Sequence, residues 1–202
     1  MKSGMNAAIW MTIAPAMVAL LIAPAIALPS PAFAASYHVS SEASCKALPL
    51  SGGNATWASS THWCTIPAGS TLTLSGNYTL AIDSGVMLIN EGAIQNGGGA
   101  TITIASGAMI HNIGTFDNTG KVEGSGIILN IGVLNNAATI ALSSPGGIEN
   151  TKTGILANSA FVNTGFLTNA GTLINSGIIN SKTHVENTGT IINSGTIKSP
   201  PP

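Results

Sequence analysis

A six-residue repeat, Asn-x-Gly-x-aliphatic-x, recurs through most of this chain of 202 residues. A repeat this short is typical of solenoids, in which each copy buries its single apolar residue only by stacking on neighbouring copies. The repeat therefore constrains the fold more than any other feature of the sequence. The clearest copies begin at Asn90, Asn112, Asn118, Asn130, Asn163, Asn169, Asn175, Asn187 and Asn193.

Within each copy the asparagine, the glycine and the aliphatic residue lie two positions apart. Side chains of an extended chain alternate between its two faces, so these three are expected to point inward, with Thr, Ser and Ile outward. A helix would scatter them, and this density of Asn, Gly, Thr and Ile disfavours helix. The pattern predicts short strands joined at corners where Asn and Gly adopt left-handed backbone conformations.

Three hexads form a coil of 18 residues, which is the separation of Asn112 from Asn130 and of Asn169 from Asn187. The sequence thus predicts an all-β, single-stranded β-helix of roughly six or seven coils over residues 71–197, with a right-handed coil favoured because coil length varies. Stacked asparagines are expected to form a hydrogen-bonded ladder. Its predicted members are Asn112, Asn130, Asn169, Asn175, Asn187 and Asn193.

Two further expectations concern the regularity of the repeat. Stretches near residues 97–111, 141–151 and 180–186 interrupt the hexads and are interpreted as loops or irregular turns. A β-sandwich is the alternative fold, and its strands would be longer and less uniform than these hexads.

The hexads resemble the Asn-x-Gly-x-Ile repeats of extracellular β-solenoid proteins, which include adhesin-like sequences and autotransporter passengers. The resemblance covers residues 71–197. It implies a secreted or cell-surface protein with a structural or adhesive role and no catalytic activity. Cell-surface glycans and further copies of the chain are the partners considered.

The chain begins with a segment typical of an export signal. An uncharged apolar run over residues 7–28 follows Lys2, and Ala32-Phe33-Ala34 fits a cleavage site. Residues 1–34 are interpreted as a secretory signal peptide, with an uncleaved membrane anchor as the alternative. No membrane span is expected after cleavage. Residues 35–70 then form an N-terminal cap segment, and residues 198–202 form a proline-rich tail.

The only two cysteines, Cys45 and Cys64, lie in the predicted cap. In an exported chain we expect them to form one disulfide that closes a loop of about 20 residues, which stabilises by roughly 3 kcal/mol. Trp57 and Trp63 fall inside the same loop. They are interpreted as part of an aromatic cluster under the disulfide, and a sugar-stacking surface is the alternative.

Charged residues make up only 6% of the chain, the formal net charge is -1, and arginine is absent. Nucleic-acid binding requires a basic surface and is therefore not expected. The four histidines are scattered, so neither a metal site nor a cofactor is predicted. Few titratable groups are left for catalysis.

Two weaker functional alternatives stay open. Asp117 and Glu123 lie one hexad apart and are the weak candidates for a polysaccharide-binding or polysaccharide-cleaving protein, because glycoside hydrolysis uses paired carboxylates. The T-x-T pairs 71–73 and 101–103 leave ice binding as a minor alternative. Such pairs would have to recur at the spacing of the coils.

Overall fold

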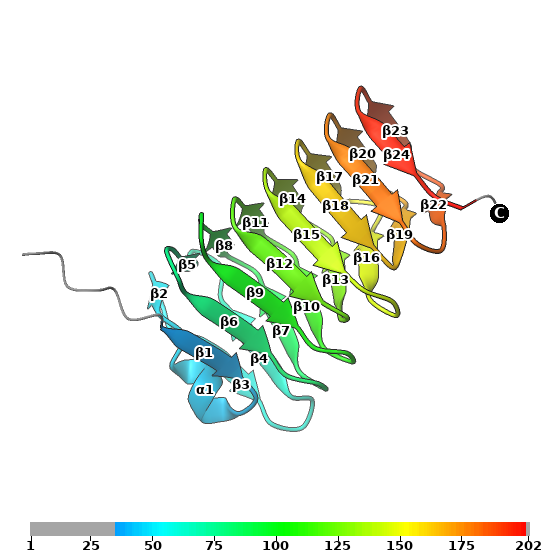
Figure 1. Ribbon diagram of the computed structural model, residues 1–202. Coiled ribbons are helices and arrows are strands. Elements are labelled where there is room, and N and C mark those ends of the chain that lie inside the picture. The colour runs from blue at the N-terminus through cyan, green and yellow to red at the C-terminus, as the bar shows by residue number, and fades with distance from the viewer. Residues whose placement is uncertain (1–34, 201–202) are drawn as a thin grey trace, which may run out of the picture. The chain divides into compact units, whose positions relative to one another are not determined.

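The computed structural model describes residues 35–200, which form a β-solenoid of seven coils around one apolar core (Figure 1). Each coil contributes one strand to each of three sheets, visited in the order C, B, A along the chain. Within the seven coils, strands pair only in parallel, each with the equivalent strand of the next coil. The predicted solenoid is confirmed, and the alternative β-sandwich is wrong, because a sandwich consists of two antiparallel sheets.

Each sheet has eight strands. Sheet A contains β1 (Ser36–Val39), β6 (Thr79–Ile82), β9 (Thr101–Ile104), β12 (Lys121–Gly124), β15 (Thr139–Leu142), β18 (Phe161–Thr164), β21 (Ile178–Ser181) and β24 (Thr196–Lys198). Sheet B contains β2 (Leu50–Ser51), β5 (Thr71–Leu74), β8 (Ala93–Asn96), β11 (Thr115–Asn118), β14 (Val133–Asn136), β17 (Ile155–Asn158), β20 (Thr172–Asn175) and β23 (Thr190–Asn193). Sheet C contains β3 (Thr56–Ala58), β4 (Trp63–Ile66), β7 (Met87–Asn90), β10 (Met109–Asn112), β13 (Ile127–Asn130), β16 (Gly147–Asn150), β19 (Phe166–Asn169) and β22 (Val185–Asn187).

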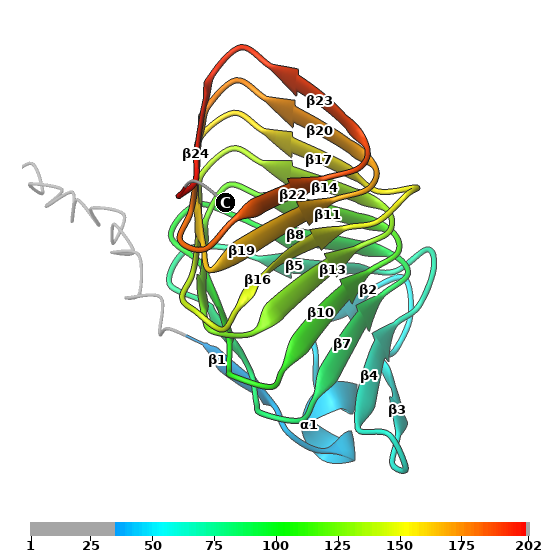
Figure 2. The ribbon, with the colours of Figure 1, turned by 90° about the vertical axis from the view of Figure 1, so that its right-hand side faces the viewer.

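The coils wind in a right-handed sense. In Figure 2 the C-terminal coils face the viewer, and the chain runs counter-clockwise through β22, β23 and β24 as it advances. A right-handed path is the usual connection between parallel strands of one sheet, because the right-handed twist of the strands favours it. The favoured handedness is therefore the one found.

The core is built from stacked side chains, two from each typical strand. In a typical strand of four residues the second and fourth point inward, as Ile110 and Asn112 do in β10, and both are fully buried. The second positions form an apolar column inside each sheet. In sheet C the middle of this column is Leu88, Ile110, Ile128, Ile148 and Leu167, all fully buried.

Asparagine fills the fourth position at two of the three corners and forms two ladders rather than one. In each ladder, the Nδ2 of one asparagine donates to the Oδ1 of the next at 2.7–2.8 Å. The sheet C ladder contains Asn90, Asn112, Asn130, Asn150, Asn169 and Asn187. The sheet B ladder contains Asn96, Asn118, Asn136, Asn158, Asn175 and Asn193. All six predicted residues are members, four in the first ladder and Asn175 and Asn193 in the second.

In both ladders each amide donates toward the C-terminal end, and both ladders begin in coil 2. In coil 1 the equivalent positions hold Ile66 and Leu74, which offer no amide. The Oδ1 atoms of Asn90 and Asn96 are consequently buried without a hydrogen-bond partner. Every later member receives its neighbour's amide, so polar groups inside a narrow core are paired from coil to coil.

The hexad glycines serve a purpose other than the one predicted. Left-handed glycines do occur at corners, but in the four-residue turns of the first two coils, as at Gly69, Gly85 and Gly99. At the Asn-x-Gly corners the prediction is wrong, because among residues 35–200 neither the asparagines nor the glycines of this motif have a positive φ. Gly114 is instead needed for close approach, since a Cβ there would lie 2.0 Å from the carbonyl oxygen of Gly92. A Cβ on Gly132 would likewise lie 2.1 Å from the carbonyl oxygen of Gly114. The glycines therefore stack at the corner beside the asparagine ladder.

The interpretation of residues 97–111 as a loop is wrong, since they contain β9 and the start of β10. Strands likewise begin or end within the other two predicted interruptions: β15 and β16 near 141–151, and β21 and β22 near 180–186. The stack also begins with β4 rather than at Thr71, because β4 pairs in parallel with β7. At the corner from sheet A to sheet C the fourth strand residue is never asparagine, and the one Asn-x-Gly there, which begins at Asn163, starts from the third residue of β18. The repeat is therefore hard to follow at this corner.

The N-terminal residues cover the first coil. β1 pairs in parallel with β6, whereas β2 and β3 pair antiparallel with β5 and β4. The helix α1 (Glu42–Lys46) lies beside β1, β3 and β4. At the opposite end, the inward residues of coil 7, Val185, Ile191 and Ile197, are only half-buried within the residues that the structure describes.

Candidate functional site

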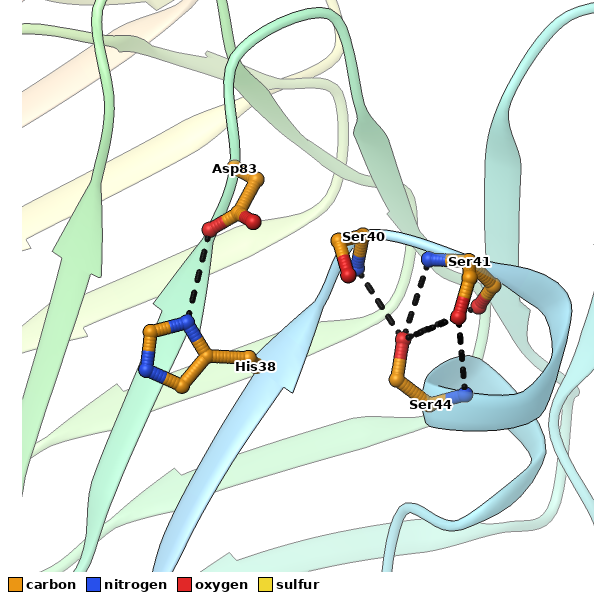
Figure 3. Close-up of polar contacts among 5 residues, drawn as sticks. All are labelled: His38, Ser40, Ser41, Ser44 and Asp83. Atoms are coloured by element: carbon orange, nitrogen blue, oxygen red, sulfur yellow. Dashed lines mark hydrogen bonds and ion pairs between the residues drawn. The ribbon is translucent and has the colours of Figure 1, made fainter.

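The N-terminal cap is held by a short helix and a disulfide. The side chain of Ser41 accepts a hydrogen bond from the backbone N–H of Ser44, and the Ser44 hydroxyl accepts one from the backbone of Ser41, so the two form a capping box (Figure 3). Cys45 on α1 is bonded to Cys64 on β4, and both residues are fully buried. The predicted disulfide is therefore confirmed, and it ties the cap to the first coil.

The two candidate tryptophans do not form a common surface. Trp57 in β3 lies opposite Cys64, while Trp63 in β4 lies opposite Ala58. Trp57 therefore shares the inward face of Cys64, and it packs against the core. Trp63 points outward and is 41% exposed. Trp57 thus belongs to the cap, whereas Trp63 belongs to the outer face of sheet C.

The two candidate carboxylates face outward from different sheets. Asp117 is the third residue of β11 in sheet B, and Glu123 is the third residue of β12 in sheet A. Glu123 forms an ion pair with Lys121 on its own strand. Asp117 accepts a hydrogen bond of 2.8 Å from Nδ2 of Asn135 in the next coil. Each carboxylate has its own local partner, and no contact joins the two within residues 35–200.

The histidines lie in separate surroundings. His38 Nδ1 lies 3.5 Å from Oδ1 of Asp83 on the exposed surface of sheet A (Figure 3). His111 lies on the outer face of sheet C, where burial lowers its pKa from 6.5 and its Nε2 has no hydrogen-bond partner. His62 is in the β3–β4 turn, and His184 accompanies Thr183 in the turn before β22. Across residues 35–200, no three His, Cys, Asp or Glu side chains gather in a way that suits a metal ion.

The threonine pairs considered for ice binding lie on different faces. Thr71 and Thr73 are outward residues of β5 in sheet B, whereas Thr101 and Thr103 belong to β9 in sheet A. In sheet A the strand after β9 places Lys121 and Glu123 at the matching positions. The two pairs therefore do not build one array of threonines.

The outer faces of the three sheets differ, which the hexads did not predict. From β4 to β13, sheet C presents a surface that we call the apolar face, which includes no carboxylate or lysine. Its outward residues are Trp63, Thr65, Met87, Ile89, Met109, His111, Ile127 and Leu129. Trp63 is 41% exposed and Ile89 is buried, whereas the other six are half-buried. The first acidic residue in these positions is Glu149 in β16. Over the same coils, sheet B has a polar row of Thr73, Gln95, Asp117 and Asn135, and sheet A has the ion pair of Lys121 and Glu123. In the later coils, sheets B and A carry exposed apolar side chains of their own, namely Ile155, Ile174 and Ile192 in sheet B and Phe161 and Ile178 in sheet A.

A shallow pocket of about 210 Å³ opens on the polar side of the solenoid. It lies at the corner between sheets B and A, and its lining residues are Gln95, Asn96, Gly97, Asp117 and Thr119. Asp117 is the one sequence candidate found there. Sequence analysis did not identify Gln95 as a candidate. Its position next to Asp117 follows only when the two coils are aligned with a separation of 22 residues.

Comparison with known proteins gives no relative. No protein-family model matches the chain, and neither a curated protein nor a solved structure matches it. Between residues 35 and 200, no helix has both the length and the apolar composition needed to cross a membrane.

Proposed function

We propose that the chain is a secreted or cell-surface structural rod with an adhesive role and without catalytic activity, similar in function to adhesin-like solenoids. The observation that carries this proposal is the apolar face of sheet C. Export is supported by the signal-like residues 1–34, which lie outside the described residues, and by the buried disulfide, which is typical of oxidising compartments.

The apolar face has the character of a contact surface. Side chains from four successive strands lie in register, so they form a regular plane rather than scattered apolar residues. Among them, burial keeps His111 neutral at neutral pH by lowering its pKa. Apolar patches larger than a few hundred Å² commonly mark interaction sites on soluble proteins, and a smaller patch such as this one suits a weak contact.

The size of the apolar face favours an extended apolar surface over a second copy as its partner. Four strands at 4.8 Å spacing, each about 13 Å long, cover roughly 250 Å² in plan. A stable dimer buries about 800 Å² on each partner, which this face does not supply. An extended hydrocarbon surface can bind many rods at once and does not require each rod to bind tightly.

The free energy of binding one rod through its apolar face is consistent with an extended apolar surface as the partner. Burying the whole face, roughly 250 Å² in plan, gains at most about 6 kcal/mol, because Thr65 and His111 are polar and Ile89 is already buried. Association itself costs about 4–15 kcal/mol, so a single rod is held weakly. Adhesion is therefore expected where many copies are carried together on one particle or cell, because the binding of one rod then raises the effective concentration of the others.

Adsorption onto methyl-terminated and hydroxyl-terminated monolayers tests the proposal, with the chain carried in many copies on beads. The variant Met109→Lys places a charge in the middle of the apolar face, and we expect it to reduce bead retention on the methyl surface. Thr115→Lys is the matched control, because Thr115 holds the same outward position of coil 3 on sheet B. Equal retention of the two variants, with unchanged circular dichroism, would contradict the adhesive proposal.

Polysaccharide binding is the second candidate function, and the polar row of sheet B favours it. Polysaccharide cleavage has less support, because Asp117 and Glu123 face outward from different sheets and have separate partners. Ice binding also has less support, since the threonine pairs occupy different sheets.

A further inference from the structure

Four hydrogen-bonding side chains form a row across the outer face of sheet B. Thr73, Gln95, Asp117 and Asn135 are the third residues of β5, β8, β11 and β14, and each is in register with the next. Their spacing is therefore the strand spacing of about 4.8 Å. Together they form a polar row that crosses four successive coils.

Hydrogen bonds join the row at its two ends but not in its middle. The hydroxyl of Thr73 donates to Oε1 of Gln95 at 3.1 Å, and Nδ2 of Asn135 donates to Oδ1 of Asp117 at 2.8 Å. Gln95 and Asp117 are neighbours in register, yet no hydrogen bond joins them. Among the described residues, Nε2 of Gln95 and Oδ2 of Asp117 thus have no partner.

The pocket lies where the row is interrupted. Gln95 and Asp117 both line it, together with Asn96, Gly97 and Thr119. The turn from β8 to β9 has four residues, Gly97–Ala100, whereas the turn from β11 to β12 has only Thr119 and Gly120. A longer turn therefore lies next to a shorter one at this corner. The pocket lies between them, beside Nε2 of Gln95 and Oδ2 of Asp117.

We propose that Gln95 and Asp117 form a binding subsite for the vicinal hydroxyl groups of a neutral sugar. Each sugar hydroxyl both donates and accepts, so one can accept from the Gln95 amide while its neighbour donates to the Asp117 carboxylate. No arginine exists in the chain to favour an acidic sugar, and the only charge lining the pocket is negative. The pocket is shallow and smaller than the 300–1,000 Å³ typical of drug-sized ligands, so at most one sugar ring can lie against it.

The geometry also sets the strength of binding. The outward positions of the row carry no aromatic side chain, so a sugar here is held by hydrogen bonds without stacking on a ring. Binding of a single sugar is therefore weak, and a polysaccharide laid along the row gains from repeated contacts. The subsite lies on a different sheet from the apolar face, so this inference is independent of the proposed adhesive role.

Titration of the isotope-labelled chain with glucose, galactose, mannose and N-acetylglucosamine, followed by amide NMR, tests the subsite. We expect at least one of these sugars to shift the side-chain amide of Gln95 and the backbone amides of Asp117 and Thr119. Asp117→Ala should weaken that binding by roughly 10-fold or more, since hydrogen bonds to charged groups are the stronger ones. Gln95→Ala should weaken it by about 2- to 10-fold.

Glu123→Ala is the matched control, because Glu123 is the third residue of its strand in the same coil. It should leave sugar binding unchanged, as should Met109→Lys on the apolar face. The proposal is overturned if none of the four sugars shifts these amides, if Asp117→Ala binds as the unmodified chain does, or if Glu123→Ala weakens binding equally. Loss of methyl-surface adhesion in Met109→Lys with retained sugar binding separates the two proposals.

Discussion

Replacing Asn130 with alanine should be among the most damaging single changes in this protein. Asn130 is fully buried in the middle of the sheet C ladder. Its Nδ2 donates to Oδ1 of Asn150 at 2.7 Å and to the carbonyl oxygen of Ile155 at 3.0 Å, while its Oδ1 accepts from Asn112 at 2.8 Å. Nδ2 also lies 3.3 Å from the carbonyl oxygen of Gly132, to which it donates, so alanine removes four hydrogen bonds and leaves their partners inside a narrow core.

The expected loss follows from these contacts. A buried polar group without its partner costs about 1–3 kcal/mol. Four groups lose a hydrogen bond, but the amide of Asn112 still donates to the carbonyl oxygen of Val133, and the neighbours can relax in part. We therefore expect Asn130→Ala to lower the free energy of unfolding by about 3–6 kcal/mol. This is a large part of the 5–15 kcal/mol that ordinarily stabilises a folded domain.

Asn193→Ala is the matched control within the second ladder. Asn193 is exposed in coil 7, where it accepts from Asn175 and donates only to the carbonyl oxygen of Gly195. Water can replace these bonds, so the expected loss is about 1 kcal/mol or less. Urea unfolding followed by circular dichroism measures both values. Equal losses for Asn130→Ala and Asn193→Ala would refute the view that burial makes the ladder stabilising.

The remaining predictions concern the cap, a corner and one histidine. Reducing the Cys45–Cys64 disulfide should destabilise the cap by roughly 3 kcal/mol and speed amide exchange in α1 before the distal coils. Gly114→Ala should cost about 1–3 kcal/mol in urea unfolding through overpacking, whereas Gly98→Ala, whose nearest Cβ contact is 4.0 Å, should cost almost nothing. Burial lowers the pKa of His111 from 6.5, so the folded chain takes up a proton there less readily than the unfolded chain does. The free energy of unfolding should therefore fall as the pH drops below 6.5 toward the folded-state pKa. His111→Leu should remove that part of the pH dependence.

The inward-facing residues could be predicted from the sequence because the six-residue repeat determines all of their positions. Alternation placed Asn112 and Phe116 inward, and both are buried. The separation of 18 residues between Asn112 and Asn130 gave the coil length, and the larger separations came from longer corners. Each inward position meets the same surroundings in every coil, so one copy of the repeat is informative about all of them.

Other features depend on contacts that the hexad does not encode. Ile82 and Ile104 occupy the third corner in place of asparagine, so β9 was mistaken for part of a loop. The glycines were explained by backbone conformation, although the contact that selects Gly114 is the carbonyl oxygen of Gly92, 22 residues earlier in register. The relation of Gln95 to Asp117 is of the same kind, because it appears only after the coils are aligned.

The arrangement separates stability from recognition. Inward positions repeat with little variation because each must fit between two neighbouring coils, and a change such as Asn130→Ala is felt through several buried contacts. Outward positions touch only their neighbours in the sheet, so Met109, Asp117 and Lys121 differ within a single coil without disturbing the core. A binding property of this rod must therefore reside in how the outward residues align between coils. Variants of Met109 and Asp117 should change binding with little loss of stability, whereas variants of the ladders should lose stability first.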